Sequence, residues 1–239
     1  MKYTSVLKKR EEVAEGTMAF YFEKPSGFEF IAGQHVVMTH INPPETDAEG
    51  DRRVLCIASA PSEKGLIFAM RMRDTAFKRV LATMPIGTAV EIDGPYGEFI
   101  LHSDLSRQAV FLAGGIGITP FRSMILDAAG NNLSHRIFLF YSNYRRKGSA
   151  FFEELRDMQE ENSNYTFIAT MTDVKKSNRA WEGETGYVNK EMLRKHLGSL
   201  LEPVYYIAGP PGFVLAMRGL LQEEGVDSAD VKFDQFVGY

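Results

Sequence analysis

The feature that most constrains the fold of this chain is a glycine-rich segment at residues 112–120, LAGGIGITP. The apolar residues 109–113 predict a buried strand before it, and apolar residues at helical spacing predict a helix over 120–129 after it. Glycine lets a strand-to-helix turn approach a ligand closely, because glycine has no Cβ. Thr119 is expected to be the N-cap of the helix, with Pro120 as its first residue. The unpaired N–H groups and positive end of such a helix suit a pyrophosphate.

The glycines follow the pattern Gly-x-Gly-x-x-Pro, which differs from the Gly-x-Gly-x-x-Gly of the dinucleotide-binding fingerprint. A turn of this kind also occurs in proteins where its role is purely structural. The choice between a ligand-binding turn and a structural turn therefore depends on the rest of the chain.

Composition limits the class of protein. The chain has 239 residues, enough for one large domain or two small ones, and it is 44% hydrophobic and 24% charged, as globular proteins are. Its net charge of -4 argues against a nucleic-acid partner. The N-terminal residues lack the apolar core of a signal peptide, and no run approaches the roughly 20 apolar residues of a membrane span. We therefore expect a cytoplasmic protein without a membrane span.

Cysteine and histidine usage limits the chemistry. The single cysteine, Cys56, excludes an internal disulfide and any iron–sulfur cluster held by several cysteines of this chain. The five histidines show no metal-ligand spacing, so no metal site is expected.

Residues 1–103 are expected to form a first domain, a small antiparallel β-barrel, because short strand signals recur between turn signals. One short helix is predicted over 76–82, with Thr75 as its cap. A polar loop with two prolines spans residues 42–51. The strands are predicted at 17–22, 35–39, 53–58, 66–71 and 88–93.

Three features of this half suit a phosphate group. Arg52 and Arg53 open a strand whose next residues are apolar, and Arg71 and Arg73 precede the predicted helix. The segment GPYG at residues 94–97 predicts a tight turn with exposed backbone amides. Arginines and helix-start amides both bind phosphate well. Taken one at a time, each feature is more typical of a surface arginine or a hairpin turn.

Residues 109–239 are expected to form a second domain in which strands and helices alternate, joined to the first by a linker at 104–107. This alternation predicts a parallel sheet with helices on both faces, and such sheets bind ligands at the carboxyl ends of their strands. Strands are predicted at 109–113, 136–142, 165–170, 204–208 and 231–234, and helices at 120–129, 149–160, 189–197 and 211–223.

The carboxyl end of the second of these strands leads into a basic sequence. Ser142 and Asn143 are followed by Arg145, Arg146 and Lys147, where dinucleotide-binding folds usually carry an acidic residue for the ribose hydroxyls. The basic residues suit a 2′-phosphate, and they are equally typical of a solvated loop.

By their order and spacing, four motifs resemble those of the ferredoxin–NAD(P)H reductase family of flavoproteins. They are the strand RVLCIAS at 53–59, the turn GPYG at 94–97, the turn GGIGITP at 114–120 and the strand end AGPPG at 208–212. The resemblance covers nearly the whole chain. It implies an N-terminal antiparallel β-barrel that binds a flavin, followed by a Rossmann-like parallel-sheet domain that binds a nicotinamide dinucleotide.

The resemblance assigns the flavin to residues of the first half. Arg53 would hold the flavin pyrophosphate, and Leu55 stands where the family has a tyrosine stacked on the isoalloxazine ring. Cys56 stands where the family has a serine that hydrogen-bonds near flavin N5. Partners for a pyrophosphate favour FAD over FMN. The other implied flavin-binding residues are Val54, Phe68, Met70, Arg73 and Thr75.

The resemblance assigns the dinucleotide to the second half. Its pyrophosphate would lie on the glycine-rich turn, and its nicotinamide beside the late strand end. In some members a terminal aromatic residue covers the flavin face, and Phe236 or Tyr239 stands in the corresponding part of this chain. The implied dinucleotide-binding residues are Gly115, Ile116, Gly117, Thr119, Ser142, Asn143, Arg145, Thr172, Asp173, Ala208, Gly209 and Pro210.

Two of the departures from the family pattern concern the proposed contacts with the flavin. Leu55 offers an apolar surface but loses aromatic stacking, worth about 0.5–1.5 kcal/mol, so weaker flavin retention is expected. The Cys56 thiol is a poorer hydrogen-bond donor than a hydroxyl, so slower hydride transfer is expected. A nucleophilic role for Cys56 ranks lower, because no histidine is nearby in sequence and an apolar strand keeps its pKa high.

The implied activity is hydride transfer from C4 of NADH or NADPH to N5 of FAD, with Cys56, Phe236 and Tyr239 in catalytic positions. Electrons would then pass to a separate acceptor, such as ferredoxin, flavodoxin or another electron carrier. Arg145 and the basic residues after it favour NADPH, whereas Asp173 would repel a 2′-phosphate and tips the expectation slightly toward NADH.

Lys8, Lys9, Arg10 and Arg52 offer a docking patch for an acidic carrier, although dispersed surface charge explains them slightly better. The alternative function is a non-catalytic flavin- or nucleotide-binding module, or an electron-transfer subunit of a larger complex. Departures from the family pattern at Leu55, Cys56 and Ala208 keep this alternative open.

Overall fold

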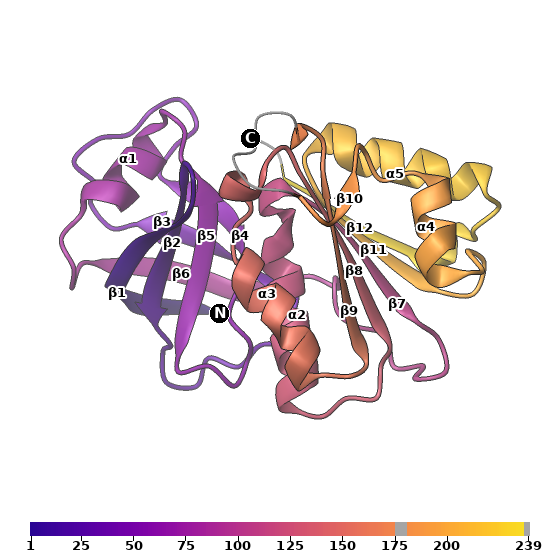
Figure 1. Ribbon diagram of the computed structural model, residues 1–239. Helices are drawn as coiled ribbons and strands as arrows, with labels where there is room; N and C mark the ends of the chain where they lie inside the picture. Colours follow the sequence, from indigo (N-terminus) through magenta and orange to yellow (C-terminus); the bar gives the residue numbers. More distant parts are fainter. Residues whose placement is uncertain (175–180, 237–239) are drawn as a thin grey trace.

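The chain folds into two sheets with a layer of helices between them (Figure 1). The computed structural model describes residues 1–174 and 181–236. Strands of the first sheet lie within residues 2–96, and strands of the second within residues 109–235.

The first sheet is antiparallel and curls into the predicted barrel. Its strands are β1 (Lys2–Ala14), β2 (Thr17–Glu23), β3 (His35–His40), β4 (Arg52–Cys56), β5 (Gly65–Arg71) and β6 (Ala89–Tyr96). They run in the order β4-β3-β6-β1-β2-β5, and each neighbouring pair is antiparallel. The two edges meet where the Ala58 N–H donates to the Ile67 carbonyl at 2.8 Å. The short helix α1 (Ala76–Thr83) covers one end.

The 13-residue strand β1 was not expected from the sequence. Residues 8–12, KKREE, are all charged and obscure the apolar alternation that identifies a strand. In the structure β1 pairs with β6 on one side and β2 on the other, with register shifts around residues 7–9 and 12–14. Pairing on both edges holds a strand in which Ser5 and Leu7 are the fully buried residues.

The turn predicted at residues 94–97 is instead the end of β6. Gly94 to Tyr96 continue the strand, and Tyr96 pairs with His35 of β3 across a register shift. A Cβ at Gly94, whose φ is +153°, would lie 3.1 Å from the Val36 side chain, so this close approach favours glycine. The expectation of a tight turn with exposed amides is wrong, because pairing with β3 persists to the last residue of the strand.

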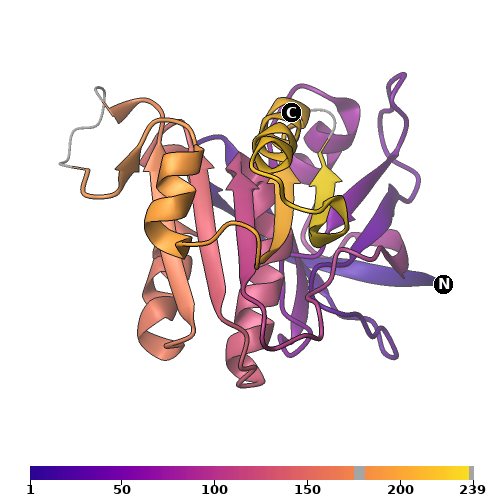
Figure 2. The ribbon, with the colours of Figure 1, turned by 90° about the vertical axis from the view of Figure 1, so that its right-hand side faces the viewer.

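The second sheet is parallel, with the order β10-β9-β8-β7-β11-β12, and it confirms the predicted Rossmann-like alternation. Its strands are β7 (Ala109–Gly114), β8 (Ile137–Asn143), β9 (Tyr165–Met171), β10 (Glu184–Thr185), β11 (Val204–Gly209) and β12 (Val231–Gln235). Helices α2 (Ile118–Gly130) and α3 (Phe152–Glu161) cover the face toward the barrel. Helices α4 (Lys190–Leu197) and α5 (Pro211–Glu223) cover the opposite face, which Figure 2 shows in front.

The helix after the glycine-rich turn begins earlier than expected. A 3-10 turn at Gly115–Gly117 leads directly into α2. Thr119 lies inside the first turn of α2, where its hydroxyl donates to the Ile116 carbonyl at 3.2 Å. Thr119 is therefore not the N-cap, and Pro120 is not the first helical residue. Pro120 still falls in the first turn, where its missing N–H removes no helical hydrogen bond.

The barrel and the parallel sheet share a hydrophobic core. Ala58 and Ile67 of the barrel belong to the same buried cluster as Ile118 and Phe121 of α2. The cluster continues through α3 to the parallel sheet. Because one core spans both halves, their relative position is held by apolar packing.

Arg122 of α2 adds a buried charge at this junction. Its guanidinium donates to the Ala58 carbonyl at 2.8 Å and to the Glu63 carboxylate at 2.9 Å. On its other side it donates to Glu154 of α3 at 2.6 Å, and it stacks over Phe151 at 5.1 Å. Only 6% of the Arg122 side chain is exposed, so its charge depends on these partners.

Replacing Arg122 by methionine should destabilise the fold, because two carboxylates at the junction lose their cation. We expect the free energy of unfolding to fall by about 3 kcal/mol. Urea unfolding followed by circular dichroism measures this loss. Arg156→Met is the matched control, because Arg156 is 47% exposed and pairs with surface carboxylates. A similar stability for both variants would contradict a structural role for the Arg122 contacts.

Candidate functional site

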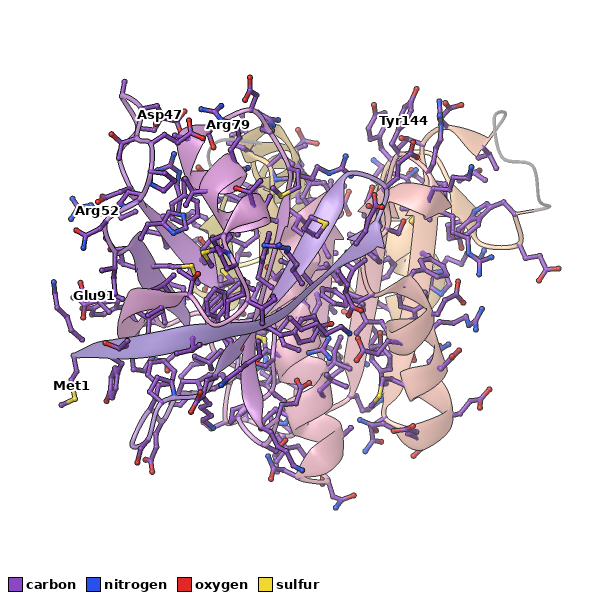
Figure 3. All side chains as sticks on the ribbon, turned by 90° about the vertical axis from the view of Figure 1, so that its left-hand side faces the viewer. Met1, Asp47, Arg52, Arg79, Glu91 and Tyr144 are labelled. Carbon is purple, nitrogen blue, oxygen red and sulfur yellow. The ribbon has the colours of Figure 1, made fainter. Side chains whose placement is uncertain are left out.

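The start of α1 and the carboxyl ends of the parallel strands lie at the same edge of the molecule. Figure 2 shows the arrowheads of the parallel strands at the upper edge, and Figure 1 shows α1 at the upper side of the barrel. Figure 3 labels Asp47 and Arg79 beside α1, and Tyr144 after β8, along this upper edge. Ligands held by the two sheets can therefore approach each other here.

The predicted flavin-binding residues of β4 alternate between the two faces of the strand. Val54 is 64% exposed, whereas Leu55 packs partly against the barrel core and Cys56 is 6% exposed. Phe68 and Met70, also predicted to contact the flavin, are buried within that core. A cofactor beside β5 would therefore meet the backbone of these two residues.

The start of α1 gathers positive charge. Thr75 is its N-cap, as predicted, and the Thr75 hydroxyl accepts from the Lys78 N–H at 3.4 Å. The Lys78 side chain is 8% exposed. Burial lowers the pKa of Lys78, and Arg73 and Arg53 lower it further. A buried lysine beside two arginines is an arrangement suited to an anion. Lys78 was not predicted as a site residue, although its spacing of three residues from Thr75 places both on one helix face.

A loop of the same chain supplies an anion at this place. We call residues 42–51, between β3 and β4, the acidic loop. The Asp47 carboxylate accepts from the Ala76 N–H at 2.6 Å, which lowers the pKa of Asp47. Glu49 pairs with Arg53 at 2.7 Å, and two loop carbonyls also accept from the Arg53 guanidinium. The Arg53 guanidinium is thus already bound to carboxylate and carbonyl oxygens of this loop.

The glycine-rich turn packs against the end of β11. A Cβ at Gly117 would lie 2.2 Å from the Ala208 carbonyl oxygen, so no larger residue fits there. Gly115 has φ +55° and, among the described residues, has no neighbour within 4 Å of the position of a Cβ. Gly209 has φ +157° and lies against Gly114. The structure thus brings the predicted pyrophosphate turn and the predicted nicotinamide strand end together, and it leaves the turn open at Gly115.

The end of β8 carries a buried amide without a partner. Ser142 and Asn143 are 8% and 4% exposed. Neither the oxygen nor the nitrogen of the Asn143 side-chain amide makes a hydrogen bond within the described residues. The backbone carbonyl of Asn143 accepts from the Thr172 N–H at 3.0 Å, which joins the ends of β8 and β9. Buried polar groups are normally paired, so this amide is suited to a bound polar ligand.

Arg145 and Asp173 form an ion pair at this edge. The Arg145 guanidinium donates to the Asp173 carboxylate at 2.9 Å and 3.2 Å. The Asp173 side chain is 16% exposed. Arg145 also stacks over Tyr144, with 4.9 Å between the guanidinium and the ring centre. The carboxylate therefore neutralises the arginine that was predicted to bind a 2′-phosphate.

Cys56 contacts a residue that was not predicted to belong to the site. Its thiol donates to the Asp234 carboxylate of β12 at 3.4 Å. Burial raises the pKa of the Cys56 thiol, and Asp234 raises it further. Burial lowers the pKa of His35, and Asp234 partly opposes this effect. Asp234 was missed because it lies 178 residues from Cys56 in sequence and carries no local motif.

Phe236 follows β12 and lies beside the end of β11. The Phe236 N–H donates to the Gly209 carbonyl at 3.1 Å, and its ring is partly buried against the shared core. Tyr239, the other predicted gating aromatic, lies outside the described residues.

The cations offered as a docking patch are largely paired within the barrel. Lys8 pairs with Glu23 at 2.7 Å, and Lys9 with Glu11 at 2.5 Å. Arg10 donates to a backbone carbonyl at 2.7 Å. This arrangement favours dispersed surface charge over a docking patch for an acidic carrier.

Comparison with known proteins relates part of this chain to oxidoreductases. Residues 111–219 match the family described as the oxidoreductase NAD-binding domain. One component of the Na(+)-translocating NADH-quinone reductase of Serratia proteamaculans is 29% identical over 201 residues, which cover 78% of this chain and 49% of that protein. The chain therefore spans about half the length of the curated relatives that it matches.

Solved structures share the fold at low identity. The flavohem-like FAD/NAD binding domain of nitric oxide dioxygenase from Vibrio cholerae superposes with a TM-score of 0.83 at 18% identity, covering 98% of each chain. A ferredoxin NADP+ reductase from Neisseria gonorrhoeae superposes with a TM-score of 0.79 at 18% identity, also covering 98% of each chain.

The barrel and the parallel sheet together have the fold of ferredoxin–NAD(P)H reductase-like proteins, which confirms the fold that the resemblance implied. Within this fold, residues 111–219 carry the oxidoreductase NAD-binding domain. Among residues 1–174 and 181–236, no helix is long and apolar enough to cross a membrane.

The Cys56 thiol should be unreactive in the folded protein, because burial and Asp234 both disfavour the thiolate. We expect a thiol reagent at pH 8 to label the folded chain at least about 100-fold more slowly than the chain in denaturant. Absorbance of the released chromophore measures both rates. Cys56→Ser shows the background, since the chain has one cysteine. Fast labelling of the folded protein would instead indicate a nucleophilic thiol.

Proposed function

We propose that this chain is an NADH-dependent, FAD-containing reductase that passes electrons to a separate acceptor. The observation that carries the proposal is the contact between Cys56 of β4 and Asp234 of β12. It joins the strand proposed to hold the flavin ring to the edge of the sheet proposed to hold the nicotinamide.

The groups at α1 fit the phosphates of FAD. The Asp47 carboxylate on the Ala76 N–H acts as a stand-in for a phosphate oxygen, because both are anions that accept from a helix-start amide. Arg53 and Lys78 supply positive charge beside it. Thr75 caps the same helix start. These residues are proposed to hold the pyrophosphate, with Val54, Leu55 and Cys56 along the flavin ring.

The second edge fits a nicotinamide dinucleotide. The open turn at Gly115 admits a pyrophosphate close to the backbone, and the unpaired Asn143 amide offers a donor and an acceptor to the sugar or base. Ala208, Gly209 and Phe236 would line the nicotinamide. Bound FAD would supply the N5 atom that accepts hydride from nicotinamide C4. The protein residues position the two rings and exclude water from the space between them.

The Arg145–Asp173 pair favours NADH as the donor. The Asp173 carboxylate already pairs with Arg145 and would repel a 2′-phosphate beside it. The same carboxylate can accept hydrogen bonds from the ribose hydroxyls of NADH.

A second candidate function is electron transfer within a larger complex. It is favoured by the similarity to one component of a sodium-translocating NADH-quinone reductase and by the share of that protein which the chain spans. The paired cations of β1 give no specific support for ferredoxin or flavodoxin as the acceptor.

An anaerobic absorbance spectrum of the purified chain, reconstituted with FAD, tests the proposal. NADH should bleach the visible absorbance of the flavin, because the oxidised ring is reduced. Dinucleotide binding without bleaching would indicate a binding module instead. No flavin bound at any concentration would exclude the reductase.

Asp173→Asn should shift the donor preference toward NADPH, because it frees Arg145 to pair with a 2′-phosphate. We expect the ratio of kcat/KM for NADPH over NADH to rise about tenfold, equal to about 1.4 kcal/mol of relative stabilisation. Steady-state kinetics with both donors measures this ratio. Adding Arg145→Gln should abolish the gain. An unchanged ratio in Asp173→Asn would show that the pair does not select the donor.

A further inference from the structure

The acidic loop contacts α1 through more groups than an ordinary surface loop needs. In addition to Asp47 and Glu49, the Glu45 carboxylate pairs with the Arg79 guanidinium through two hydrogen bonds, at 2.6 Å and 3.0 Å. Figure 3 shows Asp47 and Arg79 close together at the upper edge of the barrel. Three carboxylates from one loop therefore bind two arginines and the Ala76 N–H around a single helix start.

The acidic loop lies on the surface and adds nothing to the hydrophobic core. Residues 44–49 are all exposed, and the Glu49 side chain is 63% exposed. Gly50 follows them with φ +75°, a conformation that glycine adopts without strain. Moving residues 45–49 away from α1 would break ionic contacts and hydrogen bonds but would leave the barrel core closed.

A phosphate cannot share this position with the acidic loop. The Ala76 N–H already has an acceptor at 2.6 Å, and a phosphate oxygen would need the same place. A phosphate bound to Arg53 would also lie beside the Glu49 carboxylate that already pairs with this arginine. If the loop stayed, its carboxylates would lie against a second anion, and like charges in contact repel each other.

We propose that the acidic loop is an internal competitor for the phosphate groups of the flavin, so that Asp47 and Glu49 must leave before FAD can bind. This inference rests on the proposed flavin-dependent function and adds a specificity-determining element to it. The loop lowers the affinity for flavins that carry phosphate and leaves the affinity for the ring and ribityl chain unchanged. FAD is then a dissociable ligand of this chain.

The aliphatic character of β4 supports the same proposal. Leu55 offers methyl groups to a flavin ring at the position where the resemblance implies an aromatic side chain, which would add stacking energy. A ring held by aliphatic contacts depends more on its phosphates for affinity. Competition at the phosphates therefore has a larger effect on whether the flavin stays bound.

The test compares FAD with riboflavin, which has the same ring system and ribityl chain but no phosphate. Quenching of flavin fluorescence gives the Kd of each flavin for the full chain and for Asp47→Asn/Glu49→Gln. Asparagine and glutamine keep an acceptor oxygen, so the Ala76 N–H keeps an acceptor while two charges are lost. Glu49→Gln alone leaves Asp47 in place, and circular dichroism confirms that each variant is folded.

Asp74→Asn is the matched control. Asp74 precedes the cap of α1, is 89% exposed and pairs with Arg79, but it contacts neither Arg53 nor the Ala76 N–H. It therefore removes one negative charge near the site without removing a competitor.

The double variant should bind FAD at least about tenfold more tightly, with the Kd of riboflavin unchanged within about twofold and Asp74→Asn close to the parent chain. Equal or weaker FAD binding by the double variant would overturn the proposal. So would an equal gain for riboflavin, because the loop would then act on the ring. If neither flavin binds any of the chains, the flavin-dependent function itself fails. Riboflavin binding with unchanged FAD affinity would instead reject the loop proposal alone.

Discussion

The buried guanidinium of Arg122 and the apolar core around it hold the barrel and the parallel sheet in one fixed relation. Its three acceptors come from the barrel and from α3, so neither half can turn against the other without leaving a charge unpaired in a poorly solvated place. Only with this relation fixed do the start of α1 and the carboxyl ends of the strands open toward one edge. The contact of Cys56 with Asp234 follows from it.

A second constraint is that the chain pairs its candidate anion-binding arginines with its own carboxylates. Arg53 pairs with Glu49 of an exposed loop, whereas Arg145 pairs with Asp173, whose side chain is largely buried. The two pairs differ in how they respond to a phosphate. An exposed loop can move aside, because its departure uncovers no apolar surface. The Asp173 carboxylate is held at the end of a core strand and cannot move aside. It therefore excludes the phosphate and does not exchange with it.

The fold of the second half was predictable, because helix and strand periods alternate there with clear turn signals. Strand β1 was not, because its charged residues are held by pairing on both edges and not by their own pattern. Of two threonines expected to cap helices, Thr75 does so and Thr119 does not, since a 3-10 turn starts the second helix early. Asp47, Lys78 and Asp234 act through partners distant in sequence or through burial, which no local motif reveals.

Both candidate functions involve the transfer of electrons to a partner. They differ mainly in how long the electron-accepting partner stays bound. Strand β4 is an edge strand of the barrel, and Val54 is 64% exposed on it. On the proposed function, the donor would enter at the carboxyl ends of the parallel strands, so this apolar edge remains accessible to an electron acceptor. A free carrier and a neighbouring subunit would approach the same surface, and only the area buried would distinguish them. A dissociable flavin adds a third possibility that the same surface permits, in which the reduced flavin itself leaves and carries the electrons away.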